Sequence, residues 1–285
     1  MALTASQVAT FRETGLSYPH RMVSAQRAAE LLGELESYEA RTGGPVNGKY
    51  RYKSHLVFPW INELMREEAI LEHVGDILGP DLMVWTSHLY PKESGDGRFI
   101  SWHQDSAHWG LDSDQIVTVW IALTTATAEN GCMRMLRGSH HRGQVAHEDT
   151  WDKDNMLTRG QRIVEDIDES QAVWVELQAG EASIHHVDMW HASKANDSAS
   201  RRVALALRYI TPQARQTRVD HDFATLVAGT DTYGHFELEP RCERLMDPAM
   251  IALHARIADS QGSIYLSGTD RAGVGGLTET SVLNQ

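Results

Sequence analysis

Apolar residues recur at helical spacing along the first eighty positions of the chain. One stripe follows Ser24 at intervals of three and four residues, and another lies between 61 and 78, just before Gly79 and Pro80. Stripes of this kind predict amphipathic helices that pack one face into a core. Thr4 and Ser24 are favourable N-cap residues, so we expect one helix to begin after each of them and a third to run from 61 to 78.

Beyond Leu82 the apolar residues form short runs separated by glycine- and asparagine-containing turn signals. Many short strands at this spacing are typical of a β-sandwich or barrel. The polar stretch 156–169 is expected to be a loop or insertion, and 245–257 a helix ahead of a tail rich in glycine and serine. The expected strands are 82–90, 115–123, 172–177, 181–186 and 202–210.

The composition fits a folded globular protein, because 41% of the 285 residues are hydrophobic. No apolar run approaches the roughly 20 residues of a membrane span. The first residues lack the basic and apolar regions of a signal peptide, so we expect a cytoplasmic protein. The two cysteines, Cys132 and Cys242, fit a reduced pair in that compartment.

Acidic residues outnumber Lys and Arg by 39 to 26, which gives a net charge of −13. A charge of this sign argues against nucleic acid or an anionic membrane as a partner. A small molecule is the expected partner, and it can itself be anionic if a few buried arginines bind it. The choice between a monomer and a homodimer stays open.

The segment Trp102–Asp105 carries a pattern that suits a metal. In a strand, residues two apart point to the same face, so His103 and Asp105 can aim at a common point. A third ligand is needed, and the candidates are His185, His186 and His191. Two histidines and one carboxylate on one face of a metal leave other positions open, as a non-haem iron(II) oxygenase requires. Alone the pair is weak evidence, because such a pair often occurs by chance in a chain with 15 histidines, as a surface histidine beside an aspartate in a turn.

Longer motifs around this pair occur in a fixed order. They are WHQDSAHW, then NGC followed by GSH, then an AGE turn before the distal histidines, and finally RRVALALRY. In this order they resemble the phytanoyl-CoA dioxygenase family of iron- and 2-oxoglutarate-dependent oxygenases, from the first helix to about Pro212. The resemblance implies a mainly β fold: a double-stranded β-helix (jelly roll, cupin-like) core with N-terminal helices packed on one sheet. It also implies a single oxygenase domain over 1–285, with a helical part to about 80, a core at about 82–212 and a C-terminal extension at about 213–285.

The resemblance also assigns the metal ligands. His103 and Asp105 match the first two family ligands. His191 matches the distal one, because a small residue and a serine follow it. His186 matches a second family histidine that is not usually a ligand, and of His185 and His186 one is expected near the site and the other away from it.

The co-substrate residues follow from the same match. Arg202, eleven residues after His191, matches the arginine that binds the far carboxylate of 2-oxoglutarate. Ser193 and Trp120 match positions that line that site. Arg201 is expected to point to the opposite face of the strand as a solvated charge.

The activity implied is hydroxylation of an unactivated C–H bond with iron(II), 2-oxoglutarate and dioxygen, which releases succinate and carbon dioxide. Relatives that halogenate replace the ligand carboxylate by alanine or glycine, so Asp105 predicts a hydroxylase. We expect a small polar metabolite as substrate: an amino acid, an ammonium compound or an aminoalkylphosphonate. The alternatives are an acyl group bound to a carrier protein or CoA, a non-catalytic cupin-like binding protein, and a zinc hydrolase. The candidate substrate-binding residues are Tyr90, His108, Trp109, His186 and Arg208, with Lys92, Arg98, Arg159 and Asp188 as further charged candidates.

Overall fold

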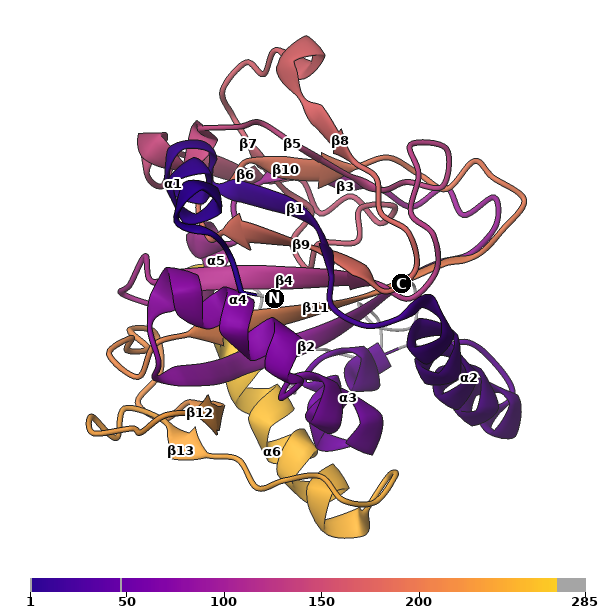
Figure 1. The fold of residues 1–285 in the computed structure, drawn as a ribbon, viewed down its shortest axis with the longest axis vertical. Coiled ribbons are helices and arrows are strands. Elements are labelled where there is room, and N and C mark those ends of the chain that lie inside the picture. The colour runs from indigo at the N-terminus through magenta and orange to yellow at the C-terminus, as the bar shows by residue number, and fades with distance from the viewer. Residues whose placement is uncertain (1, 47, 271–285) are drawn as a thin grey trace.

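Two sheets that lie one above the other form the centre of the computed structural model, which describes residues 2–46 and 48–270 (Figure 1). A two-stranded ribbon, β6 (His147–Asp149) with β7 (Gln161–Ile163), lies beside them. The smaller sheet has the order β3 (Ile100–His103), β10 (His191–Ser193), β5 (Met133–Met135) and β8 (Val173–Val175). The larger sheet has the order β1 (Leu16–Arg21), β9 (Glu181–His186), β4 (Ile116–Ala122), β11 (Arg202–Ile210), β2 (Leu82–Lys92), β12 (Phe223–Ala228) and β13 (Glu237–Leu238).

Neighbouring strands are antiparallel except for the short β12–β13 pair. The larger sheet is open, and the smaller sheet covers one face of it. The predicted mainly β, jelly-roll fold with flanking helices is therefore confirmed. The expected strands all form, although the one expected at 172–177 shortens to Val173–Val175.

The helices lie largely on the other face of the larger sheet and at its ends (Figure 1). Thr4 forms the predicted capping box with Gln7, and Ser24 accepts a hydrogen bond from the backbone N–H of Arg27. Short 3-10 turns lie at Gly48–Arg51, Ser54–Leu56, Ser139–Arg142 and Glu169–Gln171. The helices are α1 (Ala5–Thr14), α2 (Ala25–Thr42), α3 (Pro59–Leu64), α4 (Glu68–Leu78), α5 (Ser106–Trp109) and α6 (Pro248–Tyr265).

The single helix predicted over 61–78 is wrong, because the chain breaks it into α3 and α4. Glu67 has an extended backbone at the break, and the Tyr209 hydroxyl donates to the Met65 carbonyl at 2.8 Å. That bond occupies a carbonyl that an unbroken helix would use internally. The loop expected at 156–169 also contains β7, and the C-terminal helix runs eight residues further than expected. The glycine- and serine-rich tail lies largely outside the described residues.

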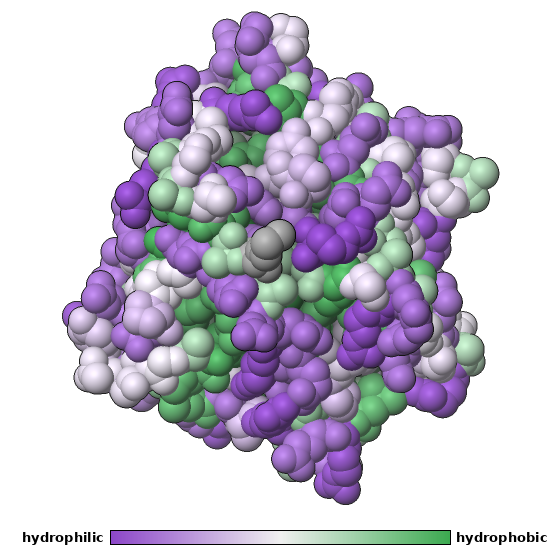
Figure 2. Space-filling model, viewed as in Figure 1, coloured by the Kyte–Doolittle hydropathy of each residue, from purple (hydrophilic) through white to green (hydrophobic). Residues whose placement is uncertain are grey.

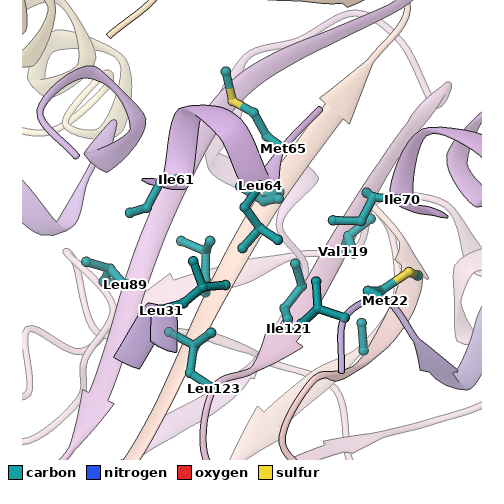
Figure 3. Packing of buried hydrophobic residues seen from close by; sticks show 14 of the residues in the cluster. Met22, Leu31, Ile61, Leu64, Met65, Ile70, Leu89, Val119, Ile121 and Leu123 are labelled. Atoms are coloured by element: carbon teal, nitrogen blue, oxygen red, sulfur yellow. The ribbon is translucent and has the colours of Figure 1, made fainter. Parts of the chain in front are cut away.

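Strand alternation divides the larger sheet into two different faces. Val119 and Ile121 of β4 point toward the helices, where Leu31 and Leu64 pack against them (Figure 3). The intervening Trp120 belongs to the cluster between the two sheets. The helices therefore close one face with aliphatic packing, and the other face is free to carry polar groups.

The outer surface carries a mixture of residue types. Polar side chains cover most of the face in Figure 2, with smaller apolar areas between them. Within the described part of the chain, no helix is both long and apolar enough to cross a bilayer.

A buried ionic network joins the 3-10 turn Ser54–Leu56, with Lys53 just before it, to Glu239 just after β13. Lys53 Nζ lies 2.6 Å from Glu239 Oε1, and His55 Nε2 lies 2.9 Å from Glu239 Oε2. Burial opposes ionisation of Glu239, but Lys53 and His55 lower its pKa to about 2. The carboxylate is therefore charged in the folded protein.

We expect Glu239→Ala to lower the free energy of unfolding by about 3–5 kcal/mol, because it leaves the Lys53 ammonium buried without a counter-charge. The control Glu237→Ala removes an exposed partner of Arg256 and should cost less than about 1 kcal/mol. Urea unfolding followed by circular dichroism measures both. Equal losses in the two variants would contradict the importance of the buried network.

Candidate metal centre

Three buried side chains meet at the edge where β3 pairs with β10. His103 ends β3, His191 begins β10, and the two residues are paired directly across the ladder. Asp105 follows two residues after His103. One ligand atom from each of the three lies within 4.8 Å of the others, which is the spacing a single metal ion needs.

The route by which Asp105 reaches this point differs from the expected one. The strand ends at His103, and Asp105 has helical φ and ψ angles of −63° and −41° at the start of α5. A turn from strand to helix, rather than strand alternation, brings the two side chains together. Gln104 holds this turn, since its side-chain amide donates to the carbonyls of Gly143 and Asp188.

Backbone carbonyls orient both imidazoles. His103 Nδ1 lies 2.9 Å from the Ser101 carbonyl, and His191 Nδ1 lies 2.9 Å from the Met189 carbonyl. A carbonyl only accepts, so each Nδ1 carries the proton and each Nε2 keeps a free lone pair for a metal.

The charge states also suit a metal. Burial raises the pKa of Asp105, but the nearby His103 side chain, 3.7 Å away, and the charge of Arg208 outweigh it and hold that pKa below its ordinary value. Burial, followed by the charge of His103, holds the pKa of His191 well below its ordinary value. An ionised carboxylate with neutral imidazoles is the state in which these groups bind metals.

A pocket beside the triad ends at Arg202 and includes Ser193 and Trp120 in its lining. The Arg202 side chain is 2% exposed and lies over the Trp120 ring at 5.3 Å. Its two terminal nitrogens donate to the carbonyls of Tyr90 and Gly131, while its buried Nε has no partner. The pocket therefore has a metal-binding triad near one end and a fixed cation at the other.

The sequence had suggested Lys92 as a substrate-binding residue. It lies instead at the Arg202 end of the pocket. Its ammonium donates to Ser193 Oγ at 2.8 Å and to the Lys194 carbonyl. Burial, together with the charge of Arg202, lowers the pKa of Lys92 to about 6. Lys92 is thus a second basic group behind the Arg202 end of the pocket, and its low pKa leaves it largely neutral while the pocket is empty.

The structure brings four of the five substrate candidates together. Tyr90, His108, Trp109 and Arg208 line a compartment that also borders His103 and Asp105. Tyr52, His88 and Tyr265 line it too. Tyr52 follows the 3-10 turn Gly48–Arg51, His88 lies on β2 and Tyr265 ends α6. Sequence reasoning missed them because none of them carries a local motif.

His186 does not join them. It lies beside Asp188 and His140, in a separate cavity next to α1, with its ring 5.1 Å from that of His140. His185 instead faces the metal pocket, with its ring 5.1 Å from that of His191. Of the two neighbours, His185 is therefore the one near the site.

Two other charged candidates pair with their own neighbours. Arg98 pairs with Asp96, and Arg159 with Asp149. The expectation for Arg201 is also wrong: it is half-buried and forms ion pairs with Glu39 and Glu93. It does face away from the site, as strand alternation requires.

Residues 3–204 match the phytanoyl-CoA dioxygenase (PhyH) family. The chain belongs to this family. It is accordingly a 2-oxoglutarate-dependent non-haem iron dioxygenase, with iron(II), 2-oxoglutarate and dioxygen as its cofactor and co-substrates.

Individual relatives agree with this assignment. The chain is 25% identical over 229 residues to a probable alpha-ketoglutarate-dependent hypophosphite dioxygenase of Stutzerimonas stutzeri. The matched region covers 74% of this chain and 79% of that protein. It is 25% identical over 154 residues to the ectoine dioxygenase of Bordetella parapertussis, across 49% of this chain and 50% of that protein. The solved non-heme monooxygenase ThoJ superposes with a TM-score of 0.80 at 36% identity, over 90% of this chain and 95% of that one.

We expect Ni²⁺ to stabilise the metal-free protein, by about 2.7 kcal/mol at a hundredfold excess over its dissociation constant. His191→Ala should abolish this gain because it removes a ligand, whereas His186→Ala should retain it. Thermal unfolding with and without Ni²⁺ measures the shift in Tm. If His186→Ala lost the shift and His191→Ala kept it, the ligand assignment would be wrong.

Proposed function

We propose that this enzyme hydroxylates an unactivated C–H bond of a small polar metabolite and converts 2-oxoglutarate to succinate and carbon dioxide. The observation that carries the proposal is one continuous pocket lined by His103, Asp105 and His191 near one end and by Arg202 at the other. Iron(II) held there, with 2-oxoglutarate and dioxygen, supplies the oxidising chemistry. The protein's own groups position the reactants and exclude water.

Arg202 is the binding group for the far carboxylate of 2-oxoglutarate. Its guanidinium is held in place by two carbonyls and by the Trp120 ring, so little side-chain freedom is lost on binding. Ser193 adds a hydroxyl on the same wall, and the Lys92 ammonium fixes that hydroxyl. A dianion bound near Arg202, and near Lys92 once that amine takes up a proton, is strongly favoured in a buried pocket.

Asp105 supports hydroxylation over halogenation. It fills the third ligand position as an ionised carboxylate, which leaves no vacant ligand position for a halide on that side. Thr118 Oγ1 lies 3.4 Å from the second carboxylate oxygen and restrains its rotation.

A small polar substrate fits two observations. The compartment beyond the metal is small and lined mainly by polar and aromatic groups. Relatives are named for their action on hypophosphite, ectoine and L-proline, all small polar compounds. A carrier- or CoA-bound acyl group is the second candidate, because other relatives are named phytanoyl-CoA dioxygenases. Family membership argues against a zinc hydrolase or a non-catalytic binding protein, while the cytoplasmic location and the oligomeric state stay predictions.

We expect the anaerobic iron(II)-loaded protein to develop a visible charge-transfer band on titration with 2-oxoglutarate. Arg202→Gln should raise the dissociation constant about ten- to hundredfold, because charge-assisted hydrogen bonds of about 1.5–3 kcal/mol are lost. Arg201→Gln is the matched control on the opposite face. In air, succinate release should require Asp105. No band in the unaltered protein, or full turnover in Asp105→Ala, would overturn the proposal.

We also expect 2-oxoglutarate to bind more tightly as the pH falls from 8 to 6. Lys92 has a pKa of about 6 in the empty pocket, so it is mostly neutral at pH 8 and takes up a proton when a dianion binds nearby. The low pKa of His191 keeps that ligand neutral in this range. Band titrations at pH 6, 7 and 8 measure the effect, and Lys92→Met should remove it. A pH dependence that survives in Lys92→Met would exclude Lys92 as its source.

A further inference from the structure

The compartment on the substrate side of the triad contains one permanent cation, Arg208. The compartment shares Arg208, Tyr90, His103 and Asp105 with the co-substrate pocket, but Arg202 is not part of its lining. Arg208 is 6% exposed. A buried guanidinium is costly unless an opposite charge lies close to it.

The Arg208 side chain is oriented by its neighbours, and its buried Nε donor is unused. Its carbon centre lies 5.9 Å from the centre of the Tyr90 ring and 5.1 Å from that of the Trp109 ring. One terminal nitrogen donates to the Tyr90 hydroxyl at 3.0 Å, and the buried Nε has no partner. The guanidinium is therefore fixed in orientation and retains a free N–H.

Among the residues that line this compartment, Asp105 is the sole carboxylate, and it is a metal ligand. Burial raises the pKa of both Tyr90 and Tyr265, so neither phenol supplies a negative charge. Burial and then the charge of Arg159 lower the pKa of His108 to about 3, so its ring is neutral. Once Asp105 binds a divalent ion, nothing else in the lining balances Arg208.

The charged residues just outside the lining of the compartment do not add a negative charge that would balance Arg208. Arg159 is paired with Asp149. Arg218 donates to the carbonyls of Ala107, His108 and Ile264 and contributes a further positive charge near His108. The electrostatic potential of the compartment therefore favours an anion.

We propose that this compartment binds an anionic group of the primary substrate, a carboxylate or a phosphonate, with Arg208 as its counter-ion. The proposal rests on the function proposed above and narrows its substrate class. Amino acids and aminoalkylphosphonates fit, whereas an ammonium compound without an acid group does not. Because Arg208 and the metal ligand Asp105 border the same compartment, the oxidised carbon lies only a few bonds from the anionic group.

Calorimetry on the full chain, loaded with Ni²⁺ and saturated with 2-oxoglutarate, tests this. The probes are methylphosphonate and acetate, with acetamide as the neutral analogue of acetate. We expect the two anions to bind at least tenfold more tightly than acetamide. Arg208→Gln should weaken anion binding at least tenfold, and the exposed control Arg142→Gln should leave it unchanged.

Four results would overturn the proposal. Acetamide could bind as tightly as acetate, or no anion could bind the unaltered chain. Arg208→Gln could leave anion binding intact, which would place the anion on the metal. The Arg208→Gln substitution could instead weaken the binding of 2-oxoglutarate as strongly as Arg202→Gln does, which would make Arg208 a co-substrate ligand. If Arg208→Gln fails to fold by circular dichroism, Arg208→Lys and the comparison of acetate with acetamide on the unaltered chain decide the matter.

The failure of this proposal is distinguishable from failure of the proposed function. Anion binding is measured with Ni²⁺ and needs no turnover. Absence of the iron(II) charge-transfer band and of succinate release would count against the proposed function alone.

Discussion

The pairing of β10 with β3 is the contact on which the site depends. It places His191 directly opposite His103, although 88 positions separate them in the chain, and the turn after His103 adds Asp105. A shift of one residue in this pairing would turn His191 to the other face of the strand and leave two ligands without a third. The Met189 and Ser101 carbonyls then fix the two rings so that the nitrogens needed for the metal stay unprotonated.

Strand alternation in β11 supplies the rest of the pocket. Arg202 and Arg208 lie an even number of residues apart and both point between the sheets, while Leu205 and Tyr209 point into the helix-covered core. The inward residues between the two arginines, Ala204 and Ala206, are small, which leaves room along the strand for a bound molecule. Strand β11 thus provides a cation at each end of that space, Arg202 at one end and Arg208 at the other.

Charge distribution gives the two sides of the metal different characters. On one side Arg202 and Lys92 lie together, and burial with the charge of Arg202 lowers the pKa of Lys92, so that Lys92 can lie beside the arginine largely as a neutral amine until an anion binds. On the other side Arg208 lies among neutral rings and phenols. Burial works against its charge, but the Tyr90 hydroxyl, which accepts a hydrogen bond from Arg208, and the Asp105 carboxylate raise the pKa of Arg208 above its ordinary value. This separation favours binding of the co-substrate and the substrate at opposite ends.

Local sequence patterns determined much of this protein. The caps at Thr4 and Ser24, the strand over Arg202–Ile210 and the order of motifs around His103 and Asp105 were readable because each depends on neighbours in the chain. The choice between His185 and His186, and the presence of Tyr265 and Lys92 at the site, were decided by tertiary structure alone. These positions depend on how the strands pack against each other and on where α6 ends. Contacts between residues far apart in the chain leave no periodic pattern in the sequence. The same holds for the break between α3 and α4, which a hydrogen bond from Tyr209, more than 140 positions away, helps to fix.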